Sequence, residues 1–203
     1  MAAIVQLEGV TKDYGQGDVT VHALRGVDLS IQKGDLAAVA GPSGSGKTTL
    51  LNVISGLDTP SAGRVWVDGK EVTKMSRSKL SKLRLMRIGF VFQAYNLIPV
   101  LTAIENAEYV LMLQGMPTKE RRELVMGLLK QVGLEGMEKR FPRELSGGQQ
   151  QRVAIARAIA AQPALVLADE PTANVDSKTA AALLDLMVRL NEEQQATFLF
   201  STH

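Results

Sequence analysis

Short apolar runs alternate with stretches of helical periodicity along this chain, and the two patterns together predict an α/β fold. Strands are predicted, from apolar runs bounded by turn residues, at 4–10, 21–31, 36–40, 63–68, 88–93, 165–168 and 197–201. Helices are predicted, from their periodicity and flanking turns, at 47–55, 149–161 and 177–193. A Gly-rich turn at 14–18 makes the first two strands an antiparallel pair, whereas the later alternation favours a mostly parallel sheet with ligands at the carboxyl ends of its strands.

The middle of the chain lacks strong β patterns. Residues 95–143 are mostly helical in pattern, with breaks at 115–117 and 141–142. This pattern predicts a helical subdomain inserted into an α/β core. We therefore expect one domain over 1–203, with its α/β core at 1–93 and 163–203 and its helical subdomain at 94–162.

Composition and charge narrow the classes of protein that remain. A net charge of +2 over 203 residues argues against a dedicated nucleic-acid binder, which usually carries a marked basic excess. Cysteine is absent and the two histidines, His22 and His203, are far apart, so disulfides and a structural zinc site are not expected. No signal peptide and no run of about 18 apolar residues occurs. We expect a soluble, cytoplasmic protein, so any membrane role would come through a partner.

A phosphate-binding loop follows the predicted strand at 36–40. The chain fits G-x-x-x-x-G-K-[ST] with Gly41, Pro42, Ser43, Gly44, Ser45, Gly46, Lys47 and Thr48. The glycines allow close backbone approach to phosphate, and the amides at the start of the following helix favour anions. Lys47 is suited to the β- and γ-phosphates and Thr48 to magnesium. A chance Gly/Ser loop is the alternative, but the strand before it and the helix after it favour function.

Two acids follow the apolar strand at 165–168. Asp169 and Glu170 are adjacent, so their side chains diverge, and one is able to face a metal while the other faces water. We assign Asp169 to magnesium, directly or through water, and Glu170 to the general base. A pair of solvated loop acids is the alternative.

A second Gly-rich turn opens the predicted helix at 149–161. It consists of Ser146, Gly147, Gly148 and Gln149. Ser146 stands where a helix N-cap would, and capping alone explains that residue. Capping does not explain two glycines, which destabilise a helix, whereas an amide nest for phosphate explains both. From these residues alone the two interpretations are equally supported.

With these three motifs in this order, the chain resembles the ATPase subunit of an ATP-binding cassette (ABC) transporter over its whole length. The resemblance implies a P-loop NTPase fold of ABC type and a homodimer, formed on ATP binding, in which the second Gly-rich turn of each subunit caps the nucleotide of the other. It implies an integral membrane permease as a further partner, ATP and Mg²⁺ as ligands, and a place on the cytoplasmic face of the membrane. No nucleic acid is expected.

The resemblance also extends to residues that no local pattern would single out. Tyr14 resembles the aromatic residue that stacks on adenine, and Gln93 the glutamine that senses magnesium and the attacking water. Residues 174–176 resemble the loop that crosses the dimer interface, and His203 resembles the histidine that contacts the γ-phosphate. Thr49 is expected to contact the nucleotide with the loop before it.

The segments 75–99 and 102–106 resemble one branch of the family, which includes lipoprotein-release, macrolide-export and cell-division ATPases. Ala173 and Val175 depart from that branch by small apolar changes, so we expect a working site. Because family members usually continue beyond the equivalent of His203, we expect the end of the domain to be missing. A soluble ABC ATPase without transport and a regulatory ATP-binding module are the alternatives.

Overall fold

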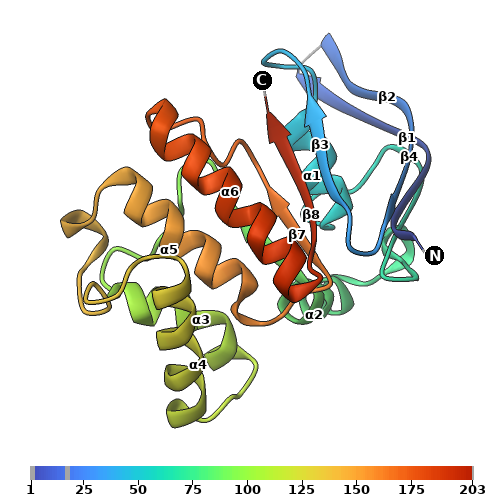
Figure 1. Cartoon of the computed structure of the whole chain (residues 1–203). Helices are drawn as coiled ribbons and strands as arrows, with labels where there is room; N and C mark the ends of the chain where they lie inside the picture. The colour runs from blue at the N-terminus through green and yellow to red at the C-terminus, as the bar shows by residue number, and fades with distance from the viewer. Residues whose placement is uncertain (1–2, 17–18, 203) are drawn as a thin grey trace.

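The computed structural model describes residues 3–16 and 19–202, and its centre is a parallel sheet (Figure 1). The sheet has the order β3-β8-β7-β6, formed by β3 (Leu36–Ala40), β8 (Thr197–Thr202), β7 (Leu165–Ala168) and β6 (Ile88–Val91). All neighbours are parallel, as the strand-then-helix alternation predicts. The expected α/β fold is confirmed.

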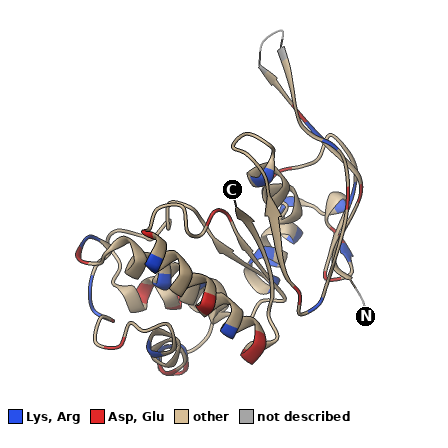
Figure 2. Cartoon of the chain, turned by 45° about the horizontal axis from the view of Figure 1, so that its top comes forward, with Lys and Arg blue, Asp and Glu red and all other residues tan. Residues whose placement is uncertain are grey.

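A second, antiparallel sheet carries the N-terminal region. Its order is β2-β1-β4-β5, formed by β1 (Ala3–Gln16), β2 (Val19–Gln32), β4 (Ala62–Val67) and β5 (Lys70–Glu71). The β1–β2 ribbon projects beyond the rest of the molecule (Figure 2). The predicted turn at 14–18 is wrong at its start, because Tyr14 pairs with Val21 and Gln16 with Val19 in the ladder. Cross-strand pairing therefore extends β1 through Tyr14.

Six α-helices complete the described structure. They are α1 (Lys47–Ile54), α2 (Arg77–Arg87), α3 (Ala103–Leu113), α4 (Thr118–Gln131), α5 (Gly147–Ala160) and α6 (Ser177–Gln194), with short 3₁₀ turns at Val72–Lys74 and Pro142–Glu144. Helices α3, α4 and α5 lie together on one side of the sheet (Figure 1). No described helix is long and apolar enough to cross a bilayer.

The two faces of the parallel sheet contribute to separate hydrophobic cores. Along β7, Val166 and Ala168 pack with the helices of the α3–α6 side, whereas Leu165 and Leu167 pack with α1 and the antiparallel sheet. All four residues of β7 are buried, because a strand covered on both faces needs a continuous apolar run. This arrangement places the carboxyl ends of β3, β7 and β8 at one edge, where α1 begins.

Candidate functional site

The loop between β3 and α1 has a backbone that requires glycine. Gly44 and Gly46 have φ of 78° and 93°. A Cβ on Gly46 would lie 2.4 Å from the carbonyl oxygen of Ala23, so a side chain has neither the conformation nor the space. Gly46 is the N-cap residue of α1, and no side-chain hydrogen bond caps the helix there among the described residues. The first amides of α1 therefore suit an anion at this helix N-terminus.

Lys47 lies folded back over the loop. Its Nζ donates to the carbonyl oxygens of Gly41 at 2.6 Å and Pro42 at 3.1 Å, and lies 3.6 Å from Oε1 of Glu170. The residue is only 6% exposed. A buried ammonium group at the start of a helix provides a strong local attraction for phosphate.

The two acids diverge, and a serine from the neighbouring strand holds both. The Ser201 hydroxyl donates to Oδ1 of Asp169 at 2.7 Å and accepts from the Glu170 amide at 2.8 Å. Asp169 is buried, and Glu170 has a φ of 44° that turns its side chain away from the strand direction. The sequence interpretation missed Ser201, although its place at the end of the last predicted strand is a signal once β7 and β8 are known to be neighbours.

A cavity of about 480 Å³ joins the phosphate loop to β1, β2 and Gln93. Ligand pockets are commonly about 300–1,000 Å³. Its lining includes the predicted site residues Tyr14, Ser43, Gly44, Gly46, Lys47, Thr48, Thr49, Gln93 and Glu170. The structure thus brings together residues separated by more than a hundred positions in sequence. Val21, His22 and Ala23 also line it, and no motif predicted them.

Other predicted residues stand outside that lining. Gly41, Pro42 and Ser45 belong to the loop but do not line the cavity, and Asp169 lies buried beside Ser201. His203 lies outside the described residues.

Gln93 lies just after β6 in a turn, so the predicted strand at 88–93 is two residues too long. The Asn174 amide Nδ2 donates to the Gln93 carbonyl oxygen at 2.8 Å, and the Asn174 carbonyl accepts from the Tyr95 hydroxyl at 3.3 Å. The loop after the acids is thereby tied to the segment after Gln93. The sequence alone gave no signal for this contact.

The second Gly-rich turn forms the first turn of α5. Ser146 caps the helix, with its Oγ accepting from the Gln149 amide at 3.3 Å while the Ser146 amide donates to Gln149 Oε1 at 2.9 Å. The capping interpretation of Ser146 is confirmed. The helix begins two residues earlier than the predicted start at 149, so both glycines are helical.

Both glycines have close side-chain neighbours within the chain. A Cβ on Gly147 would lie 2.7 Å from the Tyr95 hydroxyl oxygen, and one on Gly148 would lie 2.5 Å from Cγ2 of Thr179. Neither glycine, nor Ser146 or Gln149, lines the described cavity. A role for this turn in nucleotide contact therefore needs a second subunit.

One edge of the sheet carries a strand followed by a Gly-rich loop with a lysine and a helix, and beside them a strand that ends in acids. This arrangement defines a P-loop nucleotide hydrolase. The family model described as ABC transporter matches residues 24–173, and the chain belongs to that family. It is an ABC ATPase, the ATP-binding subunit of such transporters, as the sequence resemblance implied.

Relatives and a solved structure support this assignment. The chain is 47% identical over 203 residues to an uncharacterized ABC transporter ATP-binding protein of Thermotoga maritima, covering 100% of this chain and 86% of that protein. It is 44% identical to the lipoprotein-releasing system ATP-binding protein LolD of Legionella pneumophila, covering 98% and 88%. A dimeric structure of the ATP-binding cassette MJ0796 of Methanocaldococcus jannaschii, in a post-hydrolysis state bound to ADP and Pi, matches with a TM-score of 0.91 at 45% identity, covering 98% and 88%. The expected family branch is confirmed.

Proposed function

We propose that this chain binds Mg-ATP in the cavity at the phosphate loop, dimerises around two nucleotides and hydrolyses them to drive a membrane permease. The observation that carries the proposal is that Tyr14, Lys47, Gln93 and Glu170 all line one cavity. Tyr14 would serve the base, Lys47 the phosphates, and Gln93 and Glu170 the attacking water.

The phosphates would lie over the loop and the first turn of α1. The backbone amides of Ser43, Gly44 and Gly46, with those of Thr48 and Thr49, would supply donors to their oxygens. Pro42 has no N–H, and the Gly41 and Ser45 amides donate to the Thr202 and Pro42 carbonyl oxygens. Lys47, which now bonds loop carbonyls and faces Glu170, would turn its ammonium group to the β- and γ-phosphates. The negatively charged phosphates would be stronger acceptors for the Lys47 ammonium group than the neutral carbonyl oxygens are.

Mg²⁺ fits the site as a partner of the phosphates. The described residues contain no group of three or more His, Cys, Asp or Glu side chains placed to hold a metal alone. In nucleotide sites, Mg²⁺ is held by one or two carboxylates together with phosphate oxygens, and it keeps several waters. Thr48, Gln93 and Asp169 supply oxygens for it; one Asp169 oxygen already accepts from Ser201, which leaves the other. The bound ion would neutralise charge on the phosphates.

Glu170 would accept a proton from the water that attacks the γ-phosphorus in line. Its position beside Lys47, in the same cavity, is the reason for this assignment. Gln93, exposed after β6, would orient that water, and His203 would contact the γ-phosphate. The positive groups would stabilise the charge that is spread over the transferring phosphoryl group.

The second half of each site would come from another copy of the chain. Ser146, Gly147, Gly148 and Gln149 do not line the described cavity of their own chain. They open α5, whose N-terminus favours an anion. Loss of the γ-phosphate would remove this contact and open the dimer, which is a phosphate-controlled two-state switch.

The resulting motion would pass to an integral membrane permease, which places the chain on the cytoplasmic face of the membrane. The relative from Legionella pneumophila is the ATP-binding protein of a lipoprotein-releasing system. This similarity supports the proposal that the chain drives a membrane permease. The segment after Gln93 is a candidate contact for the permease. Arg157 links this segment to α5, the helix that begins at the second Gly-rich turn, by donating to the Tyr95 and Asn96 carbonyls at 2.9 and 2.6 Å.

Glu170→Gln tests the proposal. We expect turnover to fall by at least about 10²-fold, the scale of a positioned base, while ATP affinity remains. Light scattering on this variant should show a monomer-to-dimer shift with Mg-ATP and none with Mg-ADP.

Glu192→Gln is the matched control, because Glu192 lies near the C-terminal end of α6 and does not line the cavity. This variant should turn over ATP normally. Near-normal turnover in Glu170→Gln would remove Glu170 from the base role. A variant that binds ATP and stays monomeric would contradict the shared site.

A further inference from the structure

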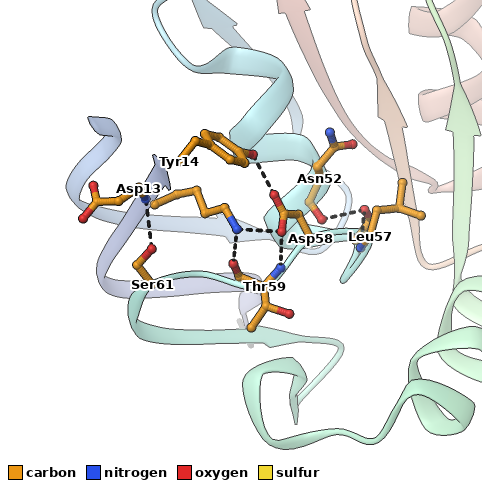
Figure 3. Close-up of polar contacts among 9 residues, drawn as sticks. Asp13, Tyr14, Asn52, Leu57, Asp58, Thr59 and Ser61 are labelled. Carbon is orange, nitrogen blue, oxygen red and sulfur yellow. Dashed lines mark hydrogen bonds and ion pairs between the residues drawn. The ribbon is translucent and has the colours of Figure 1, made fainter. Parts of the chain in front are cut away.

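Asp58, which no sequence motif singles out, holds the hydroxyl group of Tyr14. Tyr14 Oη donates to Asp58 Oδ2 at 2.6 Å (Figure 3). Tyr14 lies on β1 and lines the nucleotide cavity, whereas Asp58 follows α1, 44 positions later in the chain. The bond therefore joins the antiparallel sheet to the helix that begins at the phosphate loop.

The Asp58 carboxylate is itself fixed by two further donors. Its Oδ1 accepts from Lys12 Nζ at 2.7 Å and from the Thr59 amide at 2.7 Å. Lys12 Nζ also donates to the Thr59 carbonyl oxygen at 2.7 Å, so the lysine is tied to the same loop. Such charge-assisted bonds are stronger than neutral ones and give the carboxylate one orientation.

Lys12 also covers one face of the Tyr14 ring. Its Nζ lies 4.8 Å from the ring centroid, within the range of a cation–π contact. A ring held at its hydroxyl and on one face has little rotational freedom, and a nucleobase would stack on the other face.

The loop that carries Asp58 is anchored to α1. The amides of Leu57 and Asp58 both donate to the Asn52 carbonyl oxygen, at 2.9 and 3.1 Å. Since α1 begins at Lys47, one helix links the phosphate end of the cavity to the group that orients Tyr14.

The charge on Asp58 is maintained in this setting. Burial raises the pKa of its carboxyl group, but the hydrogen bonds from Lys12, Tyr14 and the Thr59 amide together lower it by more than burial raises it. The pKa therefore lies below its usual value. Asp58 is therefore an anionic acceptor at neutral pH.

We propose that Asp58 and Lys12 are positioning residues that hold the Tyr14 ring in place for a nucleobase and so supply the base-dependent part of nucleotide affinity. The inference rests on the proposed function, because it takes the cavity as the nucleotide site. Ordering one side chain before binding is worth about a two- to tenfold gain in affinity.

The experiment measures the equilibrium binding of Mg-ATP and of magnesium tripolyphosphate, which lacks a base, to Tyr14→Phe, Asp58→Ala and the double variant. Tyr14→Phe keeps the ring and removes only the hydroxyl group, so it tests the contact without disturbing the Asp58 loop. We expect each single variant to bind ATP about two- to tenfold more weakly, the double variant to be no weaker than Asp58→Ala, and tripolyphosphate affinity to be unchanged.

Three results would overturn the proposal: wild-type ATP affinity in both single variants, additive losses in the double variant, or equal losses for ATP and tripolyphosphate. The last would mean that Asp58 acts on the phosphate loop through α1. Glu8→Ala is the matched control, since Glu8 lies on β1 and pairs with Arg64 at 2.7 Å, away from the cavity lining; it should bind both ligands normally.

Two further variants separate this failure from a failure of the proposed function. If Tyr14→Ala weakens ATP binding while Tyr14→Phe and Asp58→Ala do not, the ring contacts the base and only its positioning by Asp58 is wrong. If Lys47→Ala leaves ATP affinity intact, the nucleotide site itself is wrong.

Discussion

At the scale of single residues, the site depends on side chains that bond two functional groups at once. Ser201 donates to Asp169 and accepts from the Glu170 amide. The hydroxyl group thus fixes a proposed metal ligand and the backbone of the proposed base together. No property of Ser201 in the sequence predicts this role, because it arises from the pairing of β7 with β8.

Ser201→Ala should therefore lower kcat more than it changes KM. Loss of about 1.4 kcal/mol of positioning corresponds to a tenfold fall in rate. Unfolding free energy should fall by about 1–3 kcal/mol, because the buried Asp169 loses its donor. Steady-state ATPase kinetics and urea denaturation measure the two effects.

Ser30→Ala is the control for that experiment, since Ser30 is an exposed β2 residue whose Oγ accepts only a 3.3 Å bond from Gln32 among the described contacts. Wild-type kinetics in Ser201→Ala would show that Asp169 and Glu170 are oriented without the hydroxyl group.

At the scale of elements, local pattern predicted most helices and strands because their signals are contiguous. The helix predicted at 47–55 is observed at Lys47–Ile54, and the one at 177–193 at Ser177–Gln194. Helix α2 was not predicted, although Ser76 caps it locally. Strand β1 is longer than predicted because its length is set by pairing with β2, which local pattern does not reveal.

The first turns of α5 and α6 meet at Gly148. The Thr179 hydroxyl donates to Asp176, the N-cap residue of α6, at 2.6 Å. Held in this way, Thr179 leaves no space for a Cβ on Gly148. Gly148→Ala should destabilise the protein by about 1–2 kcal/mol, because overpacking outweighs the helix-propensity gain of alanine.

Gly127→Ala is the matched control, because Gly127 lies in α4 with no atom within 4 Å of an added Cβ. It should stabilise the protein by up to about 1 kcal/mol. Thermal and urea unfolding measure both variants, and equal effects would contradict the close approach of α5 and α6.

At the scale of the whole molecule, nucleotide binding should stabilise the fold, because the cavity spans both sheets and α1. A ligand at about 100 times its Kd adds about 2.7 kcal/mol, which raises Tm by about 5–10 °C in a chain of this size. Lys47→Ala should remove most of this shift, since a charged hydrogen bond contributes about 1.5–3 kcal/mol.

Differential scanning fluorimetry with and without Mg-ATP measures that shift. Lys130→Ala, which removes an exposed ion pair with Glu135 in the helical region, should keep it. An undiminished shift in Lys47→Ala would contradict binding at the phosphate loop.

The family, the phosphate loop, the acids and the α/β alternation are readable from the residues alone, because each is encoded by neighbours whose spacing sets local backbone geometry. The folded chain was needed to show that Ser201 holds the acids, that Asp58 holds Tyr14 and that Asn174 bonds Gln93. It was also needed to show how closely Tyr95 and Thr179 approach the glycines of α5. These contacts depend on strand order and helix packing, which bring together residues that no local pattern relates.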